Sequence, residues 1–136
     1  MAINYSEKGA GLHAAIAAAG HWLSQVDGVW RSSNDVAVQA VIDGYNELPY
    51  YKAGKIAAIK NDGLARIQAV FPAIGDFDEL SLVREMYLSV APAARSPTSS
   101  WQRMIDIYTA GRAAVTAVSA ATTKAQVDAV VPSWPA

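Results

Sequence analysis

The chain has 136 residues, of which 52% are hydrophobic and only 17% charged, and its formal net charge is -1. It has no cluster of lysine and arginine that could neutralise phosphates, and no run near the roughly 20 apolar residues that span a bilayer, so neither nucleic acid nor membrane is an expected partner. Cysteine is absent, which excludes disulfides and thiolate metal sites.

The N-terminal segment predicts a helix over residues 8–19. Leu12, Ile16 and Ala19 recur at helical spacing. Gly20 follows, and glycine ends helices because it tolerates positive φ. The start of the chain, MAINYSEKGAG, does not resemble a secretory signal, so we expect synthesis in the cytoplasm.

A β-hairpin is predicted next, because Asp27-Gly28 suits a two-residue type I′ turn between two apolar runs. The register set by this turn divides the apolar residues between two faces, with Trp22, Val26 and Val29 on one and Leu23 and Trp30 on the other. An isolated hairpin is marginal in water. Both faces are therefore expected to pack, on helices of this chain or on another chain.

Two helices are predicted after the hairpin. The first is capped by Ser33 or Asn34 and carries a stripe of Val38, Val41, Ile42 and Tyr45. The run Asn46-Glu47-Leu48-Pro49 is expected to interrupt it, since the residue before proline is pushed out of the helical region. The second runs over about 51–70, with Ile56, Ile59, Ile67 and Val70 on one face. Gly63 lies among these residues, so either this helix bends or a neighbour approaches closely.

Three more helices are predicted in the remainder. Asp76 and Glu79 have the spacing of a capping box before a helix to about Val90. After the linker 91–97, a helix from about Thr98 carries the most regular stripe: Trp101, Met104, Ile105, Tyr108, Val115 and Val118. Thr123 and Gln126 form a second capping box, with Val127, Val130 and Val131 behind it and Pro132 at the end.

The fold class expected is therefore mainly α, a small bundle of about five to six helices with one short hairpin near the N-terminus. The length fits one domain, since domains usually have about 100 to 150 residues. We predict a single domain over 1–136, with a helix-hairpin-helix part in 1–46 and the helical bundle in 50–131.

No catalytic, metal-binding or cofactor-binding residues are predicted. His13 and His21 are eight apart across a helix end and match no HExxH spacing. No serine lies in a G-x-S-x-G elbow. The Asp76 to Glu79 run lacks calcium-loop spacing, so capping is the better interpretation. Gly9-Ala10-Gly11 is not a dinucleotide-binding motif.

The aromatic residues are the candidates for partner binding, since Trp and Tyr dominate binding hot spots. Trp101 and Tyr108, at helical spacing, are predicted to be core. Trp134 near the C-terminus and one of the hairpin tryptophans, Trp22 or Trp30, are predicted to contact a partner. The low charge supports two interpretations: an apolar surface covered by a partner, or an ordinary alanine-rich helical protein.

Three segments carry a family resemblance. They are GHWLSQVDGVWRSSNDVAVQAVIDGYNELP, KIAAIKNDGLARIQAVFPAI and IDIYTAGRAAVTAVSAATTKAQVDAVVPSWP, which together span most of the chain. They resemble small tail proteins of tailed bacteriophages and prophages. The resemblance implies a tail-fibre or baseplate-associated product in the virion, present in the host cytoplasm before assembly, and it supplies no catalytic residues.

The resemblance leads to an expected function, a non-enzymatic structural adaptor that binds other tail proteins, namely fibre or baseplate subunits, in an oligomeric setting. One alternative is a tail-fibre assembly chaperone that is released. Another is a cell-wall or polysaccharide hydrolase, for which paired carboxylates would be needed.

Overall fold

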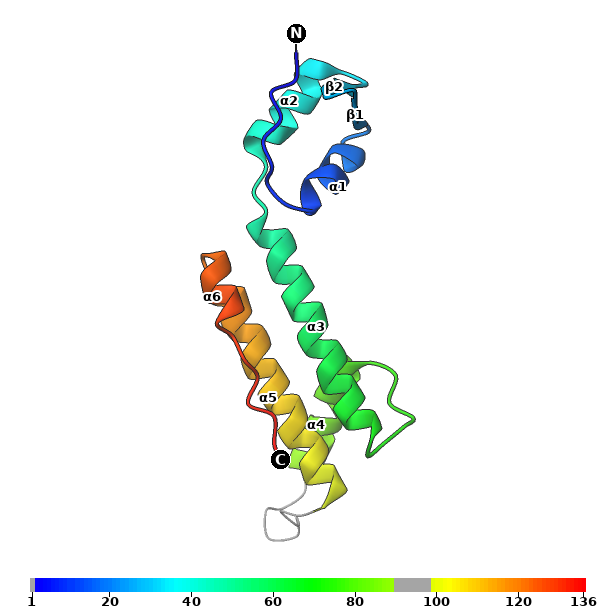
Figure 1. The fold of residues 1–136 in the computed structure, drawn as a ribbon. Coiled ribbons are helices and arrows are strands. Elements are labelled where there is room, and N and C mark those ends of the chain that lie inside the picture. The colour runs from blue at the N-terminus through cyan, green and yellow to red at the C-terminus, as the bar shows by residue number, and fades with distance from the viewer. Residues whose placement is uncertain (1, 90–98) are drawn as a thin grey trace. The chain divides into compact units, whose positions relative to one another are not determined.

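The computed structural model describes residues 2–89 and 99–136 (Figure 1). It is mainly helical with one antiparallel hairpin near the N-terminus, which confirms the predicted fold class. The elements, in chain order, are α1 Gly11–Ala18, β1 Leu23–Val26, β2 Val29–Ser32, α2 Asp35–Gly44, α3 Leu48–Gln68, the 3-10 turn η1 Phe77–Glu79, α4 Leu80–Leu88, α5 Ser100–Ala120 and α6 Lys124–Asp128.

The chain divides into two compact units, Met1–Tyr51 and Lys52–Ala136, which we call the N-terminal and C-terminal units. Each has its own buried apolar cluster. That of the N-terminal unit consists of Ile3, Leu12, Ile16, Val38 and Ile42. That of the C-terminal unit consists of Ile67, Phe77, Leu80, Met104, Ile107 and Tyr108. The prediction of a single domain stays a prediction.

The first helix begins later than predicted. α1 starts at Gly11 instead of residue 8, because Gly9 has a φ of 118° and the Glu47 carboxylate accepts a hydrogen bond from the Gly11 N-H at 3.3 Å. The predicted end is confirmed, since Gly20 has a φ of 82° and donates to the Ala17 carbonyl at 3.0 Å.

The hairpin has the predicted turn and register. Asp27 and Gly28 have φ values of 49° and 77°, as a type I′ turn requires, and Val26 pairs with Val29. Asn34 caps α2, accepting from the Ala37 N-H at 3.0 Å. Ser33, the alternative cap, instead accepts from the Trp22 N-H at 3.1 Å and so holds the open end of the hairpin.

The interruption between α2 and α3 lies earlier in the chain than the sequence predicts. α3 begins at Leu48, three residues earlier than expected, so Pro49 lies in its first turn. Proline fits there because its missing N-H would have no helical partner anyway. The interruption between α2 and α3 lies instead at Tyr45, whose ψ of 135° is extended.

Phe77 lies at the centre of the C-terminal unit, only 2% exposed. Its ring contacts the backbone of α3 and α5 where each has a glycine, since a Cβ on Gly63 would lie 2.7 Å from it and one on Gly111 2.5 Å. Trp134, from the C-terminal segment, lies against the same two glycines. Gly63 therefore marks a close neighbour, the second of the two alternatives.

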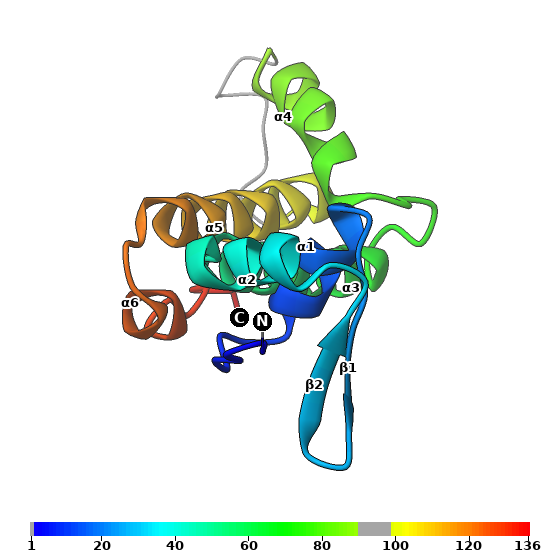
Figure 2. The same cartoon turned by 90° about the horizontal axis from the view of Figure 1, so that it is seen from above.

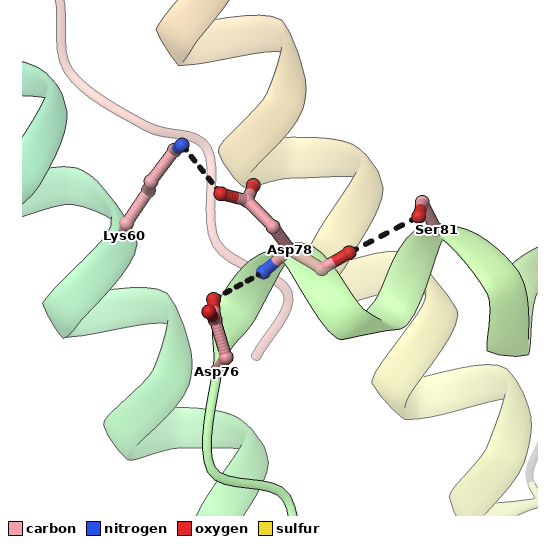
Figure 3. Close-up of polar contacts among 4 residues, drawn as sticks. All are labelled: Lys60, Asp76, Asp78 and Ser81. Carbon is pink, nitrogen blue, oxygen red and sulfur yellow. Dashed lines mark hydrogen bonds and ion pairs between the residues drawn. The ribbon is translucent and has the colours of Figure 1, made fainter.

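The cap before α4 differs from the predicted capping box. Asp76 accepts from the Asp78 N-H at 2.9 Å and so caps the 3-10 turn η1, which continues into α4 (Figure 3). The Asp78 carboxylate forms a 2.7 Å ion pair with Lys60 of α3, and its carbonyl accepts from the Ser81 hydroxyl at 3.1 Å. This turn thereby fixes α4 to α3. The helix end predicted at Val90, the linker 91–97 and Thr98 lie outside the described residues.

The last two helices have serine and threonine caps. Ser99 accepts from the Gln102 N-H at 3.0 Å at the start of α5. Thr123 accepts from the Gln126 N-H at 3.2 Å, while the Gln126 side chain accepts from Thr122 N-H rather than from that of Thr123. The C-terminal segment then runs back along α5 (Figure 1).

Candidate functional site

One face of the hairpin is apolar and exposed. Trp22, Val26 and Val29 are 54%, 49% and 56% exposed, and we call these three residues the hairpin strip. In Figure 2 the turn end of the hairpin extends beyond α1 and α2. On the opposite face, Leu23 and Trp30 pack against the core of the N-terminal unit. The prediction that both faces pack is therefore met within this chain by one face only.

The alternation of a β-strand produces this division. Successive side chains point to opposite faces, so the register that turns Trp30 inward turns Val29 and Arg31 outward. Trp30 is fixed by Tyr5, whose ring stacks on it with centroids 4.1 Å apart. The Ser24–Arg31 pair lies on the same face, between Trp22 and the Val26–Val29 pair, so the strip has apolar ends and a polar centre.

The C-terminal unit carries a second apolar surface. Val83, Met86 and Tyr87 of α4 and Trp101 of α5 line a cavity of about 380 Å³, which we call the α4–α5 groove. Met86 is 64% exposed. Leu82, one turn earlier on α4, is 66% exposed.

Trp101 was predicted to be core, and that prediction is wrong. It is 49% exposed, although its ring contacts Phe71 with centroids 5.1 Å apart. Trp101 is the second residue of α5, and a helical side chain lies over the turn that precedes it, so no earlier turn of α5 supports its outer side. Tyr108, two turns further on, is buried at 8% exposure, and its prediction as core is confirmed.

Trp134 is partly buried against its own unit. Its indole N-H donates to Asp62 at 2.9 Å, and the Arg66 guanidinium lies 5.1 Å from its ring centroid. Of the three predicted partner-binding residues, Trp22 is thus the one with an open face, while Trp30 and Trp134 make intramolecular contacts. The prediction that they bind a partner stays a prediction.

The buried carboxylate Glu47 links the elements of the N-terminal unit. At 8% exposure it accepts from Gly11 N-H and, at 2.5 Å, from the Tyr45 hydroxyl. Burial and this hydrogen bond raise the pKa of Tyr45 to about 12. Lys8 donates to the Ile42 carbonyl at 2.6 Å, at the end of α2. Glu47 and Lys8 thus complement the two helix dipoles and have a structural role.

The two histidines, for which no catalytic role is predicted, lie in different surroundings. His13 lies beside Tyr5 and Trp30, whereas His21 contacts the Ser33 hydroxyl at 3.1 Å. Glu7 accepts from Gly9 N-H and from Tyr5, which lowers its pKa.

Within residues 2–89 and 99–136, no group of three or more His, Asp or Glu side chains could hold a metal ion. No helix in this part of the chain is long and apolar enough to cross a membrane.

Comparison of the chain with protein-family models, with curated proteins and with solved structures gives no significant match. The candidate site therefore has to be judged on its own geometry. The two surfaces that the geometry offers are the hairpin strip and the α4–α5 groove.

The α4 part of the groove was missed from sequence, although a signal is present. Leu82 and Met86 are four residues apart and form a second apolar row beside that of Val83 and Tyr87. A helix with two apolar rows has more apolar surface than one core contact uses.

Proposed function

We propose that this protein is a non-enzymatic structural component of a phage tail, an adaptor that binds fibre or baseplate subunits. The observation that carries the proposal is the hairpin strip, an apolar row on a hairpin whose other face already packs on its own core. The tail setting comes from the family resemblance of the three sequence segments.

The strip has the composition of a binding hot spot. Tryptophan is enriched where interfaces contribute most free energy, and on this face Trp22 and the Val26–Val29 pair lie on either side of the Ser24–Arg31 pair. Fully burying a large apolar side chain contributes about 1.5–3 kcal/mol. Trp22, Val26 and Val29, each about half exposed, therefore have several kcal/mol left to gain from a partner.

An adaptor needs two binding surfaces, and each unit provides one. The N-terminal unit carries the hairpin strip and the C-terminal unit the α4–α5 groove. Both surfaces carry exposed apolar side chains, and permanent interfaces are more hydrophobic than transient ones. This arrangement supports a subunit that connects two others.

The decisive measurement is mass spectrometry of purified particles of the phage that encodes this chain. We expect the chain at a fixed copy number, cross-linked to a fibre or baseplate subunit through the hairpin. Its absence from the particles would reject a structural role and favour the assembly chaperone.

Two tryptophan variants and one control test the strip itself. Trp22→Ser is expected to fold normally and to be lost from particles, because Trp22 is 54% exposed. Trp30→Ser is expected to destabilise the N-terminal unit, because Trp30 packs on Tyr5 and the core. Val36 of α2 is 67% exposed outside the strip, so Val36→Ser serves as the control and should assemble. Equal incorporation of the Trp22 and Val36 variants would contradict the proposal.

A further inference from the structure

We infer that a second cavity between α4 and α5 is a carboxylate-binding site that receives an aspartate or glutamate side chain of a partner subunit. It has a volume of about 270 Å³ and is lined by Ser81, Arg84, Glu85, Tyr108, Thr109 and Arg112. The inference rests on the proposed function for the source of the carboxylate. The site itself is argued from its own residues.

The first observation is a tyrosine hydroxyl without a partner. Tyr108 is 8% exposed, and its ring packs on Phe77 with centroids 5.2 Å apart. Among the residues that the structure describes, its hydroxyl makes no hydrogen bond. Tyr108 lines the cavity, and the polar groups of largely buried side chains are almost always hydrogen-bonded, so an acceptor in the cavity would satisfy this hydroxyl.

The second observation is a pair of arginines, one from each helix. Arg84 of α4 contacts only its neighbour Glu85, at 3.5 Å, and Arg112 of α5 has no ion pair within the described part of the chain. Glu85 balances one of these two charges, which leaves one positive charge at the cavity without a counter-ion from its lining. The planar fork of arginine matches a carboxylate, which it can bind through two parallel N-H donors.

The charge of the cavity favours a carboxylate over a phosphate. The lining has two arginines and one glutamate, a formal charge of +1. A carboxylate would neutralise this charge, whereas a doubly charged phosphate would leave the cavity with a net charge of -1. The Ser81 hydroxyl already donates to the Asp78 carbonyl at 3.1 Å, so the donors are the two arginines, Tyr108 and Thr109.

The test uses the isolated full chain and a matched pair of probes, N-acetylglutamate α-amide and N-acetylglutamine α-amide, which differ in the carboxylate alone. We expect the glutamate probe to cause saturable NMR shifts of Tyr108 and of the Arg84 and Arg112 side chains, at constant ionic strength. The glutamine probe should cause none, and inorganic phosphate should bind more weakly.

Variants separate this site from general charge effects. Arg112→Gln should weaken binding by about tenfold or more, since a hydrogen bond to a charged group is lost. Tyr108→Phe keeps the ring and should weaken binding without unfolding. Arg31→Gln, the same change in the N-terminal unit, should leave affinity unchanged.

Three results would overturn the inference: equal shifts with the glutamine probe, tighter binding of phosphate, or full affinity in Arg112→Gln. None of them bears on whether the chain is found in particles. Failure of this site and failure of the proposed function are therefore distinguishable.

Discussion

Two glycine-to-alanine substitutions in one helix test the packing around Phe77. Gly63 and Gly54 both lie inside α3. A Cβ on Gly63 would lie 2.7 Å from the Phe77 ring and 3.1 Å from Trp134, whereas one on Gly54 would have nothing within 4 Å. Helix propensity favours alanine equally at both sites, so the difference between them isolates the steric cost.

The magnitudes follow from these distances. Helix propensity stabilises each variant by up to about 1 kcal/mol. Phe77 is 2% exposed and cannot turn away, and overpacking of a filled core costs about 1–3 kcal/mol. Gly54→Ala should therefore gain up to about 1 kcal/mol, whereas Gly63→Ala should range from neutral to about 2 kcal/mol less stable.

Urea denaturation followed by far-ultraviolet circular dichroism measures both variants. The free energy of unfolding of Gly63→Ala should lie below that of Gly54→Ala by about 1–3 kcal/mol. In a Phe77→Leu background the difference should shrink, because the contacting ring is gone. If Gly63→Ala were as stable as Gly54→Ala, the close approach of Phe77 to α3 would be refuted.

Three further predictions concern individual contacts. Asn34→Ala removes the α2 cap and should cost about 1 kcal/mol in urea denaturation; no loss would mean that the cap contributes nothing. Tyr45 has its pKa raised from 10.0 to about 12, so its contribution to stability is complete below pH 10 and is lost as the pH rises toward 12. A titration that follows phenolate absorbance should give this pKa, and Glu47→Gln should lower it. An unchanged pKa in Glu47→Gln would mean that the carboxylate has no effect. Trp134→Phe loses the 2.9 Å bond to Asp62 and should cost about 1 kcal/mol or less, whereas a larger loss would point to ring packing.

The features predicted correctly are those that a few neighbouring residues determine. Asp27-Gly28 specifies its turn because both residues tolerate positive φ. Asn34 and Thr123 specify helix starts because their side chains reach backbone N-H groups three residues ahead. Each of these signals is complete within a short window of sequence.

Features that depend on distant residues could not be predicted. Helical spacing gives the direction of Trp101 but not whether a neighbour covers its outer side. The start of α1 depends on Glu47, which is 36 residues away in the sequence. The same applies to the carboxylate site, whose two arginines lie on separate helices.

The composition of the uncovered hairpin face is the strongest reason to expect a partner. Strand alternation places Trp30 and Trp22 on opposite faces, and Tyr5 stacks on Trp30 while Trp22 is left open. The strands need residues with high β-propensity at Val26 and Val29, but threonine would meet that need without exposing an apolar surface. The same holds for Leu82 on α4, where glutamate or lysine would support a helix equally well. Local structure does not require these apolar residues and neither core contains them, so we propose contact with another subunit as the reason for them.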